Sequence, residues 1–345
     1  MHALPTASKA AAVRAASAVC AVTLAVAVAH WLDLSDTWWA AITAFVVPDA
    51  SWRASMGRGI LRMLGTLGGA ALGVLLGTYV PLDGLVFVVT MAASTWLGLY
   101  MAHTRRYSYS WILGIVTFVM ILCEAWTTRG GLPHFAMERC ANVAVGIAAS
   151  LVVEGVLALM RRDAAPAAAA KPSTVAHRVA ALHALQGAIA VGVFAIVLSL
   201  HQMQAFAQAM VTALAVLIVP LGADAQEAHP HIRQRMVLRL AGCAAAVLLA
   251  LALLPLLQGM PIACQVALAA GVAAGAWVQY SVPDWRYAAI QFSVAFMMVF
   301  VQDQGWTVHP RAALARLVGI AAGVGIMLVV MTLWAAVARR VAARA

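Results

Sequence analysis

Charged residues are scarce in this chain, making up 10% of its 345 residues, whereas 64% of the residues are hydrophobic. A soluble globular domain carries about 25% charged and about 45–50% apolar residues. The composition therefore excludes an ordinary soluble domain, a disordered chain and a nucleic-acid-binding domain. The formal net charge of +10 has a membrane explanation instead, because cations gather on one side of a membrane protein.

The motifs of common catalytic and metal sites are also missing. The sequence contains no HExxH, GxSxG or GxxxxGK[ST], and no pair of carboxylates has an obvious catalytic spacing. The five cysteines show no CxxC or CxxH spacing, so we interpret them as small hydrophobic residues. His229 and His231 form the only close histidine pair, and no third ligand follows at a fixed spacing. We therefore expect neither an enzyme nor a protein with a metal or cofactor.

Long hydrophobic runs, in contrast, recur along the whole chain. A helix needs about 20 apolar residues to cross a bilayer, and no segment alternates as the strands of a membrane barrel do. The sequence thus predicts an all-α polytopic membrane protein with about twelve transmembrane helices. The run between Asp36 and Asp49 predicts a short or interrupted helix. The candidate crossings are 11–32, 37–50, 59–80, 84–102, 109–125, 138–160, 178–200, 203–221, 236–257, 262–280, 287–301 and 312–337.

The distribution of Lys and Arg predicts the orientation. Cytoplasmic loops are enriched in these residues. If both termini are cytoplasmic, only four of the 22 Lys and Arg residues fall on the outer side: Arg129, Arg139, Arg311 and Arg316. We therefore expect a multi-pass protein of a bacterial inner membrane with both termini in the cytoplasm.

The first six runs resemble the last six. The segment Arg58-xxx-Arg62-xx-Gly65 recurs as Arg235-xxx-Arg239-xx-Gly242. We predict two parallel six-helix repeats, residues 1–160 and 178–345, joined by a cytoplasmic linker at 161–177 and related by a pseudo-two-fold axis along the membrane normal. Further matched pairs are Pro48 with Pro220, Tyr109 with Tyr287, Arg139 with Arg316, and Gly146 with Gly323.

The run Trp38-Trp-Ala-Ala-Ile-Thr-Ala-Phe-Val-Val-Pro48, the Arg58-xxx-Arg62-xx-Gly65 segment and Arg139 before a glycine-rich span together resemble the fusaric acid resistance and aromatic acid exporter family. This family is related to the aluminium-activated malate transporters. The resemblance implies an inner-membrane exporter of small organic anions, often aromatic carboxylates, which in some members works with a periplasmic adaptor protein. A homo-oligomer is a further possibility that the sequence leaves open.

Arginine suits a route for carboxylates because its planar guanidinium keeps its charge and matches the two carboxylate oxygens. A charge inside a bilayer costs at least about 2.5 kcal/mol, so it normally faces a cavity or a partner. We expect the paired arginines near the two mouths of a central path, with two tyrosines beside the substrate. The alternative is that Arg58 and Arg235 only follow the positive-inside rule and that Arg139 and Arg316 form structural ion pairs. The candidate path residues are Arg62, Arg239, Arg139, Arg316, Arg58, Arg235, Tyr109 and Tyr287.

Two acidic residues without a counterpart in the other repeat, Asp49 and Glu154, are candidates for coupling export to a proton gradient. The alternative is that they lie in a loop or pair with arginines. Trp31, Trp38, Trp39, Trp126 and Trp306 are expected in the interfacial belt. The predicted function is export of aromatic carboxylic acids, and the alternatives are a passive organic-anion channel or a membrane scaffold without transport.

Overall fold

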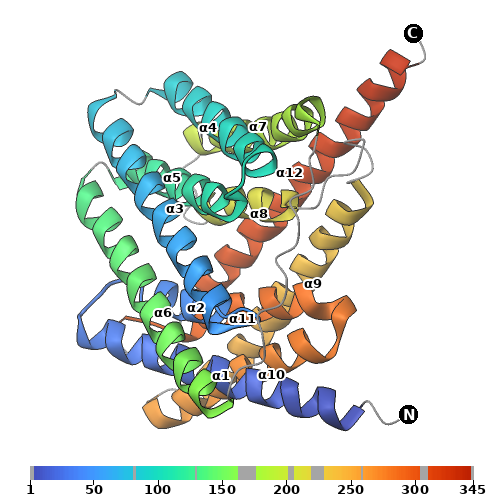
Figure 1. Cartoon of the computed structure of the whole chain (residues 1–345). Coiled ribbons are helices and arrows are strands. Elements are labelled where there is room, and N and C mark those ends of the chain that lie inside the picture. Colours follow the sequence, from blue (N-terminus) through green and yellow to red (C-terminus); the bar gives the residue numbers. More distant parts are fainter. Residues whose placement is uncertain are drawn as a thin grey trace. The chain divides into compact units, whose positions relative to one another are not determined.

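The computed structural model describes residues 4–80, 83–128, 130–161, 176–200, 206–218, 229–257, 259–303 and 310–342. Within these ranges every regular element is a helix (Figure 1), which confirms the predicted all-α class. In chain order the elements are α1 (Leu4–Trp31), α2 (Trp38–Val46), α3 (Trp52–Tyr79), α4 (Gly84–Thr104), α5 (Ser108–Thr128), α6 (Leu132–Arg161), α7 (His177–Leu200), α8 (Phe206–Leu217), α9 (His229–Leu257), α10 (Pro261–Ser281), η2 (Pro283–Trp285), α11 (Arg286–Phe300) and α12 (Pro310–Ala342). Most of the predicted linker 161–177 lies outside the described residues.

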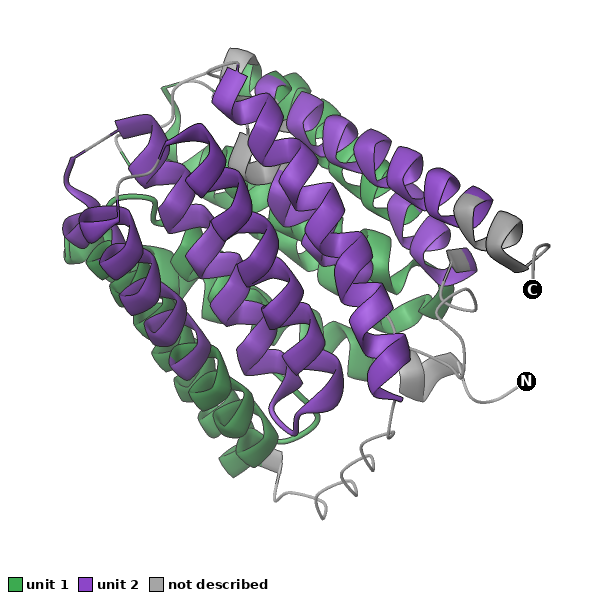
Figure 2. Cartoon of the chain, turned by 90° about the horizontal axis from the view of Figure 1, so that it is seen from above, with its two compact units in different colours: residues 1–63, 137–169, 238–314 green, residues 64–136, 170–237, 315–345 purple. Residues whose placement is uncertain are grey.

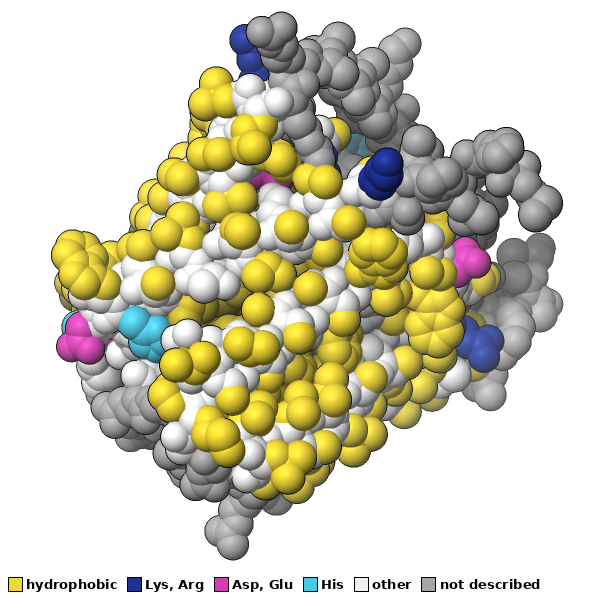
Figure 3. Space-filling view, turned by 90° about the horizontal axis from the view of Figure 1, so that it is seen from below, with side chains coloured by type: hydrophobic (Ala, Val, Ile, Leu, Met, Phe, Trp, Pro, Cys, Tyr) yellow, Lys and Arg dark blue, Asp and Glu magenta, His cyan; other side chains and the backbone are white. Residues whose placement is uncertain are grey.

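Among the described residues, nine helices are long and apolar enough to cross a membrane. The other three α-helices, α2, α8 and α11, have 9, 12 and 15 residues, fewer than the about 20 that a crossing needs. Large apolar side chains such as Leu64, Leu85 and Val156 are exposed, and the face drawn in Figure 3 is mostly apolar with few charged side chains. The chain is therefore a multi-pass membrane protein with three short helices among its spans.

The first compact unit contains residues 1–63, 137–169 and 238–314, drawn green in Figure 2. Its helix α1 packs against α2 and α10, and α11 packs against α10 and α2. Along α1 a buried stripe repeats every three or four residues, and all but one of its members are alanines, so a neighbouring helix can approach closely. The stripe consists of Ala11, Ala15, Ala18, Val22, Ala25 and Ala29.

The second compact unit contains residues 64–136, 170–237 and 315–345, drawn purple in Figure 2. Here α7 packs against α8 and α4, and α5 packs against α4 and α8. This is the pairing scheme of the first unit, with α7, α8, α4 and α5 in the places of α1, α2, α10 and α11. Each unit thus combines helices from both predicted repeats, and the division at 1–160 and 178–345 stays a prediction.

The glycine that ends each Arg-xxx-Arg-xx-Gly segment allows two helices to touch. A Cβ atom on Gly65 of α3 would collide with the carbonyl oxygen of Ser110 on α5. A Cβ atom on Gly242 of α9 would likewise collide with the carbonyl oxygen of Ala288 on α11. The repeated glycine therefore marks the same helix contact in both units.

We expect Gly65→Ala and Gly242→Ala each to lower the free energy of unfolding by about 1–3 kcal/mol, because the added methyl group overpacks a helix contact. Gly68→Ala is the matched control, since nothing lies within 4 Å of a Cβ atom there, and alanine favours a helix over glycine. Unfolding by SDS titration in mixed micelles measures all three variants. Equal losses in Gly65→Ala and Gly68→Ala would contradict the assigned contact.

Candidate functional site

The carboxylate of Asp303, which follows helix α11, contacts the N-terminus of the short helix α2. The carboxylate of Asp303, just after α11, accepts hydrogen bonds from the backbone N–H of Asp36 at 2.7 Å and of Thr37 at 2.9 Å. It also accepts one from the Thr37 hydroxyl at 3.0 Å. A carboxylate satisfies the free N–H groups at a helix start and complements the positive end of the helix dipole. Asp303 therefore fixes where α2 begins.

Matched arginines hold the C-terminal ends of the short helices α2 and α8. In the first unit Arg58 donates to the carbonyl oxygen of Val46, the last residue of α2, at 3.5 Å. In the second unit Arg235 donates to the carbonyl oxygen of Ile218, directly after α8. A cation near the last carbonyl groups of a helix is stabilising. Arg58 and Arg235 thus have a structural role in addition to the transport role predicted for them.

One helical turn further along, a second matched pair of arginines is almost fully buried. Arg62 is 5% exposed and donates from Nε to the Thr43 hydroxyl on α2 at 3.2 Å. Arg239 is 8% exposed and donates to the side-chain oxygen of Gln291 on α11. Both belong to the first unit. The hydrogen bonds fix the direction of each guanidinium, whose burial would otherwise be costly.

Arg139 on α6 is 3% exposed, and its guanidinium lies on the ring of Trp39 with Cζ 3.1 Å from the ring centroid. Among the described residues its Nε and one Nη have no hydrogen-bond partner. Its charge interacts unfavourably with that of Arg62 and favourably with that of Asp36. A cation–π contact contributes about 2 kcal/mol at a dry site. The arrangement therefore leaves two buried donors of Arg139 unpaired among the described residues.

A glycine allows α6 to bring Arg139 against α2. A Cβ atom on Gly146, two turns after Arg139, would collide with the carbonyl oxygen of Ala40 and with the side chain of Thr43. Trp39 and Thr43 are four residues apart and so lie on one face of α2. The Arg139 and Gly146 pattern in the sequence thus corresponds to a close contact between α6 and the face of α2 that carries the site.

The two acidic candidates both contact arginines. Glu154 is 5% exposed, forms an ion pair with Arg14 at 3.2 Å and accepts a hydrogen bond from Ser17 at 2.8 Å. Asp49 forms an ion pair with Arg58 at 2.8 Å. Arg14 also donates to the carbonyl oxygen of Asp49 at 2.9 Å. These contacts join α1, α6 and the segment after α2 into one ionic cluster, and proton coupling at the two acids stays a prediction.

The remaining candidate residues fall in different parts of the chain. Tyr109 and Tyr287 are half-buried in the first turn of α5 and of α11, beside the residues whose carbonyl groups face the two contact glycines. Tyr287 belongs to the first unit, and Tyr109 with Arg235 to the second. Arg316 is in α12, and its side chain lies outside the described residues. A single path lined by all the matched arginines stays a prediction.

Sequence reasoning missed three side chains of this site: Trp39, Thr43 and Gln291. The sequence places Trp39 in the interfacial belt, but in the structure its ring forms a cation–π contact with the Arg139 guanidinium. Its spacing of four from Thr43 was a signal that the two share a face. Gln291 was detectable as an uncharged polar residue within an apolar run, where such side chains usually have a hydrogen-bond partner.

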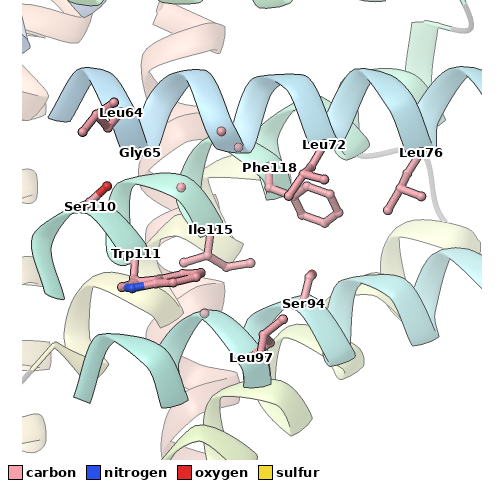
Figure 4. Close-up of a pocket in the computed structure, with 14 residues that line it drawn as sticks. Leu64, Gly65, Leu72, Leu76, Ser94, Leu97, Ser110, Trp111, Ile115 and Phe118 are labelled. Atoms are coloured by element: carbon pink, nitrogen blue, oxygen red, sulfur yellow. The ribbon is translucent and has the colours of Figure 1, made fainter. Parts of the chain in front are cut away.

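A separate cavity of about 500 Å³ lies in the second unit between α3, α4 and α5 (Figure 4). Leucines, glycines, Trp111 and Phe118 dominate its lining, and Ser94 and Ser110 are its polar side chains. It therefore offers no charge to a carboxylate, whereas the arginines of the first unit do. We take the Arg139 cluster, defined as Arg139, Arg62, Trp39 and Thr43, as the candidate functional site.

The model of the fusaric acid resistance protein family matches residues 12–190, which is more than half of the chain. The chain belongs to this family. Curated relatives include p-hydroxybenzoic acid efflux pump subunits AaeB from Salmonella paratyphi A and Salmonella arizonae, each 30% identical over 148 residues, and from Musicola paradisiaca, 26% identical over 145 residues. Each match covers 39% of this chain and 22% of the relative. No solved structure matches the chain.

A double-mutant cycle tests the ionic cluster. Arg14→Gln and Glu154→Gln should each lower the free energy of unfolding, because each leaves a charge at a poorly solvated site. The double variant should lose less than the sum of the two, with a coupling of about 1–3 kcal/mol. SDS titration measures the cycle, with the exposed Lys9→Gln as the control. Strictly additive losses would show that the pair makes no net contribution.

Proposed function

We propose that this protein exports small aromatic carboxylic acids across a bacterial inner membrane, with both termini in the cytoplasm. The observation that carries the proposal is the buried guanidinium of Arg139, which keeps unused donors beside the charge of Arg62. Membership of the fusaric acid resistance family and the likeness to p-hydroxybenzoic acid efflux pump subunits support it. The excess of Lys and Arg on the predicted inner side supports the orientation.

The Arg139 cluster offers what a carboxylate needs. Nε and one Nη of Arg139 have no hydrogen-bond partner among the described residues, and each can donate a charge-assisted hydrogen bond to a carboxylate oxygen. Arg62, held by Thr43 at 3.2 Å, adds a second charge that does not have to reorganise when the anion arrives. The charge of the anion relieves the repulsion between the two arginines. Binding is therefore favoured for an anion and gives no comparable gain to a neutral compound.

Because Trp39 and Thr43 lie on the short helix α2, binding is connected to the position of that helix. The ends of α2 depend on Asp303 and Arg58, and Arg58 in turn pairs with Asp49. Protonation of Asp49 would weaken this pair and loosen the end of α2. We therefore include proton coupling at Asp49, or at Glu154 through Arg14, in the proposal, because loss of these ion pairs would change how the end of α2 is held. A periplasmic adaptor and a homo-oligomer also stay proposals.

Arg139→Gln should reduce p-hydroxybenzoate export about ten- to a hundredfold, because one charge-assisted hydrogen bond contributes about 1.5–3 kcal/mol. Arg139→Lys should be intermediate, since it keeps the charge but loses the planar fork. The control is Arg53→Gln, which removes an exposed arginine of the same unit. Uptake of labelled p-hydroxybenzoate into inside-out vesicles, corrected for the amount of protein, measures each rate. Unchanged export in Arg139→Gln would refute the assigned site.

The same vesicles separate an exporter from the two alternatives. Coupled export should stop when a protonophore removes the proton gradient, whereas a passive channel continues to follow the electrochemical gradient of the anion. A scaffold without transport would show no flux above that of vesicles without the protein.

A further inference from the structure

The apolar cavity between α3, α4 and α5 in the second unit is closed on the inside and open on the outside. Ile115 and Phe118 line it and are buried, whereas Leu72 and Trp111 line it and are exposed. Leu72 lies well inside the candidate span Trp52–Tyr79, so hydrocarbon rather than water surrounds it. The volume of about 500 Å³ falls in the range of about 300–1,000 Å³ that is usual for sites of small organic ligands. The cavity is therefore a ligand-sized space that a molecule can enter from the bilayer.

Glycines on α3 create this space. A Cβ atom on Gly69 would collide with the carbonyl oxygen of Gly114 on α5, so the backbones of the two helices touch there. One residue earlier, Gly68 also lines the cavity, and nothing lies within 4 Å of a Cβ atom at that position. The backbone contact closes the cavity between α3 and α5, and the missing side chain at Gly68 leaves it unfilled. In a bilayer, an occupant gains from close packing in such a space rather than from leaving water.

The missing side chain belongs to the second unit and not to the packing scheme that the two units share. When the repeated segments are aligned on the contact glycines Gly65 and Gly242, Gly68 corresponds to Ala245. The equivalent helix α9 of the first unit thus has a methyl group where α3 has none. The sequence keeps the space open in one unit only at this position.

The cavity is elongated along α3 (Figure 4). Its lining on this helix runs from Leu64 to Leu76, a length of helix that rises about 18 Å. The hydrocarbon core of a bilayer is about 30 Å thick, so one leaflet contributes about 15 Å. In Figure 4, Leu64 and Trp111 lie toward one end of the cavity and Leu76 lies toward the other. The space therefore has the length of one extended acyl chain in a single leaflet.

Positive charge lies near the Trp111 end. Arg105 and Arg106 form the turn between α4 and α5, within six residues of Trp111. Both are exposed, and the guanidinium of Arg106 lies over the ring of Tyr107 with Cζ 5.6 Å from the ring centroid. Neither forms an ion pair with an acidic side chain in the described part of the chain. Both are on the predicted cytoplasmic side, where clustered arginines attract anionic headgroups.

We propose that this cavity binds one acyl chain of an anionic phospholipid, whose phosphate lies at Arg105 and Arg106. A zwitterionic lipid with the same chains fills the cavity equally well, but its headgroup carries no net charge to match the two arginines. Ser94 and Ser110 are the polar side chains of the lining, so the cavity suits hydrocarbon better than a free carboxylate. The bound lipid stabilises the second unit, because it binds the folded form alone. The proposal goes beyond the export function and does not depend on it.

The headgroup preference is measured by native mass spectrometry of the full-length protein with phosphatidylglycerol and phosphatidylcholine of identical chains. The wild type should bind phosphatidylglycerol about ten- to thirtyfold more tightly, because two arginines face its phosphate. The double variant Arg105→Gln with Arg106→Gln should lose this preference. The matched control is Arg53→Gln with Arg178→Gln, which removes two exposed arginines elsewhere and should keep it. Equal binding of the two lipids by the wild type would overturn the proposal.

The position of the chain is measured by photocrosslinking with phosphatidylglycerol that carries a diazirine near the end of one acyl chain. Labelled peptides should come from α3, α4 and α5. Gly68→Leu fills the cavity and should reduce this labelling at least fivefold. Gly57→Leu is the matched control, because nothing lies within 4 Å of a Cβ atom there either, and Gly57 is exposed on the same helix away from the cavity.

Labelling spread evenly over the spans, or undiminished in Gly68→Leu, would show lipid at the general surface only and overturn the site. Loss of labelling on addition of p-hydroxybenzoate would assign the cavity to that acid and also overturn it. Should Gly68→Leu fail to fold, the double arginine variant decides. If phosphatidylglycerol binds as expected but p-hydroxybenzoate is not exported, the export function alone has failed.

Discussion

The whole structure depends on how polar groups are satisfied where water is absent. Backbone N–H and C=O groups cannot remain unpaired in a hydrocarbon environment, and a helix leaves such groups free at each end. Helices α2 and α8, of 9 and 12 residues, are shorter than a crossing needs. Their ends must therefore be satisfied by side chains from other parts of the chain. Asp303, Arg58, Arg235 and His183 do this, and the other polar residues of interest lie around them.

The requirement explains why similar arginines have different roles. Arg58 and Arg235 hold helix ends, so their charge serves the fold first. Arg62 and Arg239 each donate a hydrogen bond to a neutral side-chain oxygen, which orients the guanidinium. Arg139 has an aromatic face beneath it and donors to spare among the described residues. The series runs from arginines that hold helix ends to a buried arginine with two donors unpaired among the described residues.

The two units show how a common packing scheme accommodates different chemistry. Each joins four helices in the same pattern, and each uses a glycine at the same place to bring two helices into contact. The side chains near these helix ends differ: Arg14 donates to the carbonyl oxygen of Asp49, three residues after α2, whereas His183 contacts the carbonyl oxygen of Leu217, the last residue of α8. A shared packing scheme thus accommodates different side chains near the ends of the short helices α2 and α8.

The sequence alone determined the membrane class, the helical segments and the family, because the length and spacing of apolar runs are local properties that a bilayer selects directly. It also found the buried arginines, since a charge inside an apolar run stands out. The tertiary structure decided which helices pack together and which side chains meet. Trp39 lies under Arg139 and Glu154 beside Arg14, residues 100 and 140 positions apart in the chain. Such contacts depend on which helix faces meet, and no local pattern of hydropathy contains that information.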